Sequence, residues 1–307
     1  MLGISLILSL VIGCGGQPAP SPEPLEEPEP ASRIEIRTAS FPADWLVDRL
    51  AGDLALRENI LPPGEDAPFW QPSGEQVAAL AAADLIVVNG AGFEGWLKTA
   101  TLPEAKVIES ASLTELIELK GKTHSHGKAG EHSHASIDPH TWSDPLGYAQ
   151  QAGVVHEALV RVMPEHEAVL DTNLGRVTED LQALHNELEA ALAPSAGVPL
   201  SASHPAFNYL ARRYTLDLTS FDFDPEEVPN AKAVAAWSSW ADGKPSPILL
   251  WEGPPTDAVK GAFPASTRHI WVDPLEQPRE GRYDYLVQAR GNVDTFRKLF
   301  SGQHSTQ

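Results

Sequence analysis

The sequence predicts an α/β fold with two lobes, each built on a mostly parallel sheet, and one long rigid helix that joins them. Three observations predict it. Short runs with strand character alternate with helical segments before residue 163, the same alternation returns after residue 194, and a leucine-patterned segment lies between. Alternating strands and helices are typical of parallel sheets, because each parallel connection needs a crossover.

The segment 33–162 is the expected N-terminal lobe. Ser73 followed by Gln76 matches a capping box, which predicts a helix start. In order, the lobe is expected to contain a strand at Ile34–Ile36, a helix from about Pro42 to Gly52, an Ala-rich helix after Ser73, a buried strand at Leu85–Val88 and a strand at Lys106–Glu109.

The segment 163–194 is the expected linking helix. Pro164 is tolerated in a first turn, and Pro194 ends the run. The apolar positions recur at spacings of four and three, the period of one helical face: Leu170, Leu174, Val177, Leu181, Leu184, Leu188 and Leu192. Such a stripe also suits a coiled-coil dimer, but its place between two α/β lobes favours an intramolecular strut.

The segment 195–307 is the expected C-terminal lobe, again with alternating strands and helices. Its expected strands are Val198–Ser201, Leu216–Thr219, Ile248–Trp251 and His269–Val272.

Composition narrows the classes of function. The 307 residues include 22 Lys+Arg and 42 Asp+Glu, for a formal charge of −20, with 42% hydrophobic residues. That hydrophobic fraction indicates a globular protein, and the negative charge disfavours nucleic-acid binding while attracting cations. A single Cys excludes an internal disulfide framework and any multi-cysteine metal site.

The first 32 residues predict export and anchoring. The apolar run Leu2–Gly13 is too short to span a bilayer, and residues 1–13 suit a signal peptide. Val11-Ile-Gly-Cys14 resembles a bacterial lipobox, so Cys14 is the expected lipid anchor; the alternative is an ordinary signal peptide with an incidental Cys. The Pro- and Glu-rich segment 14–32 then predicts an extended tether, and the remainder a body outside the cytoplasm.

The segment Gly90–Gly95 matches the GxGxxG pattern of dinucleotide-binding folds. However, Pro103 cuts short the helix that should follow, and Glu109 comes too early for the acid that contacts a ribose. These glycines are therefore expected to form a tight turn after a strand.

Histidines gather in the loop 122–134, within the string THSHGKAGEHSH. Neutral imidazoles suit Zn, Cu and Ni, which predicts weak scavenging of metal by a flexible loop; the alternative is a merely soluble, pH-sensitive loop. The residues concerned are His124, His126, His132 and His134.

Three further residues stand at strand ends or loop entrances, where α/β sheets place ligands. They are His140, His204 and Asp273. Two imidazoles and a carboxylate form a plausible set of zinc ligands. Each also has a purely structural alternative, as a helix cap, a core hydrogen-bonding group and a turn former before Pro, respectively.

The chain resembles the metal-ion solute-binding lipoproteins of bacterial ABC importers, the zinc and manganese receptors, from Arg33 to the C-terminus. Several separated motifs in the same order carry the resemblance: Ala83–Glu94 followed by Trp96, Asp138–His140 ending in Asp144–Pro145, His204–Phe207 followed by Ala211–Tyr214, and Val272–Leu275. The resemblance implies two lobes joined by a rigid long helix, with the metal held in a cleft between them. Its zinc members often carry a His-rich loop before the second ligand, the place that 122–134 occupies.

By position, His140, His204 and Asp273 match family metal ligands. Pro68 stands where the family has its first His, so the alternatives are three protein ligands with water, a further donor, or weaker metal binding than in the relatives. The candidates for that donor are Asp66, Glu65, a loop His and Glu252. Zn²⁺ is the expected metal, with Mn²⁺ the alternative.

The function implied is a monomeric receptor, lipid-anchored outside the cytoplasm, that delivers zinc to an ABC permease. Two alternatives remain open. One is a secreted zinc metallohydrolase in which Glu252 serves as general base, although the chain has no HExxH motif. The other is a metal chaperone or buffer that works without a permease.

Overall fold

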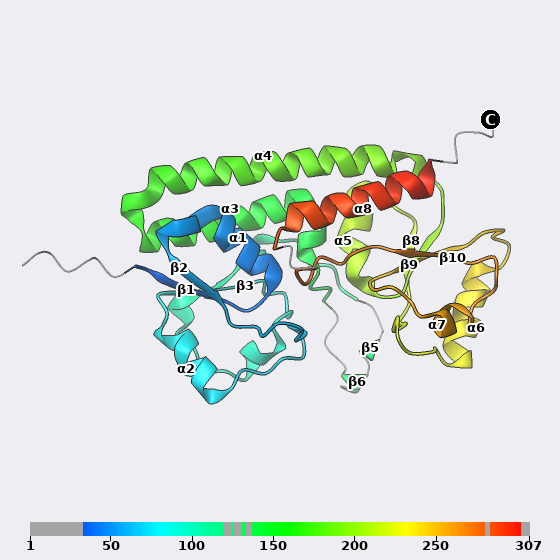
Figure 1. Cartoon of the computed structure of the whole chain (residues 1–307), viewed down its shortest axis with the longest axis horizontal. Helices are drawn as coiled ribbons and strands as arrows, with labels where there is room; N and C mark the ends of the chain where they lie inside the picture. The colour runs from blue at the N-terminus through cyan, green and yellow to red at the C-terminus, as the bar shows by residue number, and fades with distance from the viewer. Residues whose placement is uncertain (1–32, 120–123, 126–130, 133–136, 280–282, 302–307) are drawn as a thin grey trace, which may run out of the picture. The chain divides into compact units, whose positions relative to one another are not determined.

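The computed structural model describes residues 33–119, 124–125, 131–132, 137–279 and 283–301. The predicted signal peptide, tether and lipid anchor at Cys14 lie outside these residues, as do His126 and His134. The body that begins at Arg33 forms one compact unit. It contains the two α/β lobes and the long helix that the sequence predicts (Figure 1).

The N-terminal sheet has four parallel strands in the order β2-β1-β3-β4. The strands are β1 (Glu35–Thr38), β2 (Leu56–Asn59), β3 (Leu85–Val88) and β4 (Val107–Glu109). Strand β2 was not expected, because its sequence LREN has no buried residue and lies at the sheet edge. Helices α1 (Phe41–Ala51) and α2 (Gly74–Ala82) complete the lobe, and both hydrogen bonds of the capping box between Ser73 and Gln76 are present.

The C-terminal sheet also has four parallel strands, in the order β10-β9-β7-β8. All four predicted strands form, with bounds shifted by at most two residues: β7 (Leu200–Ala202), β8 (Leu218–Ser220), β9 (Ile248–Trp251) and β10 (Arg268–Trp271). The helices of this lobe are α5 (Asn208–Tyr214), α6 (Ala231–Ala241) and α7 (Asp257–Lys260).

The long helix α4 (Glu167–Leu192) packs along two other helices, α3 (Pro145–Val162) and α8 (Tyr285–Phe300), as Figure 1 shows. Short 3₁₀ turns flank it at Pro164–His166 and Ala193–Ser195. Of the predicted stripe, Leu174 is partly buried, and all the other members are buried within the chain. The stripe therefore packs against the protein's own helices, and a coiled-coil seam is not needed to explain it.

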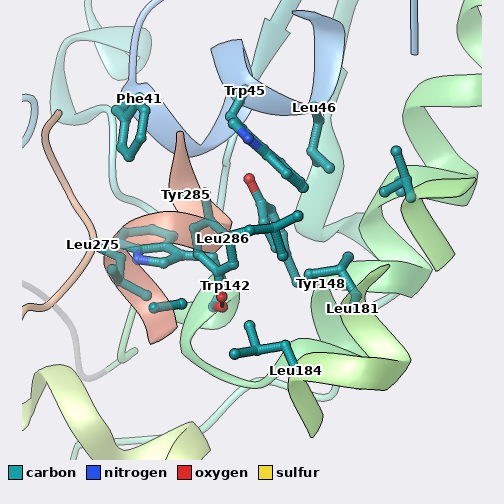
Figure 2. Close-up of a cluster of buried hydrophobic side chains, with 14 of the residues drawn as sticks. Phe41, Trp45, Leu46, Trp142, Tyr148, Leu181, Leu184, Leu275, Tyr285 and Leu286 are labelled. Atoms are coloured by element: carbon teal, nitrogen blue, oxygen red, sulfur yellow. Dashed lines mark hydrogen bonds between the residues drawn. The ribbon is translucent and has the colours of Figure 1, made fainter. Parts of the chain in front are cut away.

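One apolar core extends through both lobes. It holds an aromatic group in which Trp45 of α1, Tyr148 of α3 and Tyr285 of α8 meet beside Leu181 of α4 (Figure 2). Ring centroids lie 5.2 Å apart for Trp45 and Tyr285, and 4.7 Å apart for Tyr148 and Tyr285. Because close-packed interiors resist deformation, this shared core holds the lobes in a fixed arrangement.

The glycine-rich segment after β3 forms a tight turn, as predicted, with positive φ at Gly90 (77°) and Gly92 (82°). The buried carboxylate of Glu94 folds back into it. It accepts the backbone N–H groups of Asn89 at 2.9 Å and Gly90 at 3.0 Å, and the hydroxyl of Ser40 at 2.8 Å. In a dinucleotide fold such N–H groups face a phosphate. Here a carboxylate of the chain occupies them, which explains why the pattern marks no nucleotide site.

Candidate metal centre

A cavity of about 780 Å³ opens where the two lobes face each other. Four of its acidic and imidazole side chains follow the carboxyl ends of parallel strands, where α/β folds place their ligands. Asp66 comes after β2, His204 after β7, Glu252 after β9 and Glu276 after β10. The fifth, His140, lies in the loop that leads into α3.

His140 is held by an ion pair on each side of its ring. Its Nδ1 lies 2.6 Å from Oδ1 of the fully buried Asp138, and its Nε2 lies 2.9 Å from Oε1 of Glu276. The backbone N–H of His140 also donates to Asp138. The contact between Nδ1 and Asp138 assigns a proton to Nδ1 and leaves Nε2 facing the cavity. This is the arrangement that orients metal-binding histidines. Burial alone would lower the pKa of His140, but the charges and hydrogen bonds of Asp138 and Glu276 raise it to about 10.

His204 and Glu252 form a second pair of donors. His204 Nδ1 lies 3.9 Å from Glu252 Oε2, and the His140 and His204 ring centroids are 5.5 Å apart. Two ligands of one tetrahedral zinc ion stand about 3.3 Å apart, given bonds of about 2.0–2.1 Å. The His140–Glu276 separation of 2.9 Å is shorter than that value, and the His204–Glu252 separation of 3.9 Å is longer. Within the described ranges no three His, Cys, Asp or Glu side chains converge to hold an ion, and the two pairs stand as separate pairs of donors.

The acidic groups of the cavity disfavour one another's ionisation. Burial, followed by the charge of Glu276, raises the pKa of Glu252 to about 8 and that of Asp66 to about 7. Near neutral pH Glu252 is therefore mostly protonated and Asp66 about half protonated. A cation that binds these carboxyl groups competes with their protons.

Asp273 does not line this cavity. Its Oδ1 accepts the backbone N–H of Leu275 at 2.9 Å, and its Oδ2 pairs with Nε of Arg279 at 2.8 Å. Leu275 has a φ of 62°, so Asp273 stabilises a turn in which the chain reverses. Its position fits the structural alternative considered above, a turn former before Pro.

Glu276 was missed by sequence reasoning. It is the acid three residues after Asp273, and the turn that Asp273 stabilises carries it to His140. The only signal was a second carboxylate directly after the Asp-Pro-Leu segment.

Asp66 and Glu65, which the sequence offers as candidate metal donors, lie in different environments in the structure. Asp66 lines the cavity beside Pro68, while Glu65 is exposed and contributes its backbone carbonyl to Nε2 of Gln277 at 3.2 Å. The wall where the resemblance places a first His therefore presents a proline ring and one carboxyl group.

The residues 36–299 match the family model described as "Zinc-uptake complex component A periplasmic". The chain belongs to this family. Its members are metal-binding receptors of ABC importers, which favours a receptor over the secreted metallohydrolase. Among the described helices, none combines the length and apolar character that crossing a membrane requires.

Relatives of this zinc-uptake family differ in length. The chain is 31% identical over 241 residues to the "High-affinity zinc uptake system protein ZnuA" of Paracoccus denitrificans, covering 69% of this chain and 71% of that protein. It is 24% identical over 256 residues to the "Zinc-binding lipoprotein AdcA" of Streptococcus pneumoniae, covering 81% of this chain and 51% of AdcA. The chain thus spans about half the length of that relative.

The fold is shared with solved structures. The Zn(II)-bound ZnuA-like domain of Streptococcus pneumoniae AdcA superposes with a TM-score of 0.74 at 22% identity, covering 88% of this chain and 99% of that chain. At this identity the likeness establishes the fold alone.

Two short strands lie within the His-rich segment 122–134. Strand β5 (His124–Ser125) pairs antiparallel with β6 (Glu131–His132), and the register sets His124 opposite His132. An isolated bridge pairs Glu118 with Ile137 on the two sides of the segment. The role of this segment in metal scavenging stays a prediction.

Proposed function

We propose that this protein captures Zn²⁺ outside the cytoplasm and delivers it to an ABC permease. The observation that supports this most is the meeting of two imidazole–carboxylate pairs at one cavity, one pair spanning the two lobes and the other within the C-terminal lobe. In the proposed site His140 and Glu276 supply one pair of ligands, and His204 and Glu252 the other. Asp66 is the further donor on the wall that carries Pro68.

In this proposal Asp273 is not the metal ligand that the resemblance implies. Its match to a family ligand came from the resemblance, whereas its carboxylate is used by Arg279 and by the turn at Leu275. We therefore assign the carboxylate ligand of this segment to Glu276 and a positioning role to Asp273.

Zinc is favoured over manganese for two reasons. Imidazole nitrogen with carboxylate oxygen is a donor set that zinc accepts readily, and the two relatives described above are named for zinc. The excess of carboxylates keeps Mn²⁺ as the alternative, since Mn²⁺ prefers oxygen ligands. Competition titration with Zn²⁺ and Mn²⁺ distinguishes the two as the cargo.

Anchoring and delivery complete the proposal. Cys14 carries the lipid, residues 14–32 form the tether, and the His-rich loop, whose flanking residues Leu119 and Ile137 line the cavity, gathers ions. Metabolic labelling with a fatty acid tests the anchor, because Cys14→Ser must abolish the label. Zinc transport into vesicles that contain a zinc-importing ABC permease distinguishes a receptor from a free-standing metal buffer, which binds zinc but supports no transport.

The site itself is tested by metal analysis and competition titration of the purified protein. The proposal expects one tightly bound zinc per chain, lost in His140→Ala and His204→Ala and retained when residues 122–134 are deleted. A protein without a stoichiometric zinc site contradicts it, and tighter binding of Mn²⁺ than of Zn²⁺ changes the assigned cargo.

A further inference from the structure

We propose that this site takes its metal as a complex with a small amino-acid chelator that bears a carboxylate, rather than as a bare ion. The inference rests on the proposed metal-binding function and concerns the form of the cargo. Four features of the cavity lead to it.

The first is size. The cavity measures about 780 Å³. A water molecule occupies about 30 Å³ of liquid, so an ion with one or two waters fills only a small part of it. Pockets of about 300–1,000 Å³ are those that hold small organic molecules. The volume therefore suits an ion with an organic companion.

The second is the character of the walls. Aromatic rings of Phe69, Phe93 and Trp271 line the cavity, together with a series of prolines. Trp271 is 43% exposed and is thus available to contact a ligand. A hydrated ion gains little from apolar surface, whereas the carbon atoms of an amino acid are stabilised by it. The walls favour a ligand that has carbon as well as charge.

The third is the small number of nitrogen donors. Among the described residues two imidazoles, those of His140 and His204, line the cavity, and Pro68 beside Asp66 offers no side-chain donor. An amino acid with an amine and an imidazole supplies two further nitrogen donors, which zinc accepts in place of carboxylate oxygens.

The fourth feature is a positively charged side chain in a cavity that is proposed to bind a metal ion. Arg279 lines the same cavity, with its guanidinium 4.9 Å from the Trp271 ring centroid. Its Nε pairs with Asp273 at 2.8 Å, and its Nη2 makes a long 3.4 Å contact to the carbonyl of Glu252. A guanidinium carries five N–H donors, more than these two contacts use. A carboxylate on the chelator is the group that such a fork binds best.

The test uses Zn²⁺ alone, Zn²⁺ with L-histidine, and Zn²⁺ with histamine, which has the same nitrogen donors but no carboxylate. Native mass spectrometry of the full chain is expected to show one zinc plus one L-histidine. After correction for zinc bound by the free chelator, L-histidine should tighten zinc binding at least about tenfold more than histamine does, the effect of one charge-assisted pair.

Variants assign the effect to Arg279. Arg279→Gln should remove the difference between L-histidine and histamine, and Arg279→Lys should retain part of it. Arg297→Gln is the matched control, because Arg297 is an exposed arginine of α8 paired only with Asp294 among the described residues; it should keep the full difference. The comparison of the two chelators in the unmodified protein needs no variant to fold.

Two results overturn the inference. If zinc alone binds tightly and L-histidine only competes for it, with no ternary mass, the cargo is the bare ion and the proposed function stands. If no zinc binds in any of the three conditions, both the inference and the proposed function are wrong.

Discussion

The Nε2 atom of His140 lies 2.9 Å from the Oε1 atom of Glu276, which joins the loop before α3 to the segment after β10. On the other side of the ring, Nδ1 of His140 lies 2.6 Å from Oδ1 of Asp138. Since Asp138 is fully buried and Glu276 faces the cavity, the imidazole stands between a fixed anion and an accessible one. In the proposed site zinc takes the place of the proton on Nε2, between the ring and Glu276, while the proton on Nδ1 stays with Asp138.

Removing this imidazole should cost most of the zinc affinity. His140→Ala is expected to weaken binding by more than about 100-fold, because a direct ligand contributes at least as much as the supporting contacts around it. Competition titration measures the change. His166→Ala is the control, since His166 lies half exposed in the turn before α4; a similar loss in both variants would contradict the assignment.

The carboxylate ligand after β10 can be identified by a pair of substitutions. Glu276→Gln should weaken zinc binding at least about tenfold. Asp273→Asn should lower the melting temperature by loosening the turn at Leu275 and the pair with Arg279, with a smaller effect on zinc. The opposite ranking in titration would restore Asp273 as the ligand.

Zinc affinity should rise with pH between about 6 and 8. In the metal-free protein Glu252 and Asp66 have pKa values raised to about 8 and 7, mainly by burial, and that of His140 is raised to about 10 by Asp138 and Glu276. These groups hold protons that zinc must displace, and fewer remain as pH increases. Calorimetry in buffers of different ionisation enthalpy should detect release of at least one proton per zinc; release of none would contradict the scheme.

Substitution of Glu252 should raise the stability of the metal-free protein and weaken its binding of zinc. A carboxyl whose folded pKa lies above its unfolded value costs stability as pH rises from about 4.5 toward 8, because the unfolded chain ionises first. Glu252→Gln removes that cost. We expect its metal-free melting temperature at pH 8 to increase by about 2–4 °C, while zinc binding weakens. A lower melting temperature would show that Glu252 stabilises the empty site.

The parts of the fold that the sequence predicted are those with strong local patterns. Leu85–Val88 forms a fully buried strand, the leucine stripe of α4 packs inward, and the capping box opens α2. Strand β2 escaped notice because its exposed edge position leaves no apolar pattern. The flanking helices α3 and α8 were also not foreseen.

The site was predictable only in part. His140 and His204 stand at strand and loop ends where ligands gather, and the cavity contains both. Glu276 reaches it because a turn with positive φ at Leu275 redirects the chain, and no linear pattern reports such a turn. Whether Asp273 or Glu276 faces the cavity is decided by Arg279, a partner six residues away that neutralises the first and not the second.

In the proposed site two imidazole–carboxylate pairs, one with His140 and one with His204, jointly bind one zinc ion. Competition titration of the unmodified protein, of each single alanine variant and of the double variant distinguishes one shared site from two separate sites. We expect one tight site that either substitution abolishes, with the double variant no worse than the singles. Two independent weak sites, each lost with only its own histidine, would contradict it.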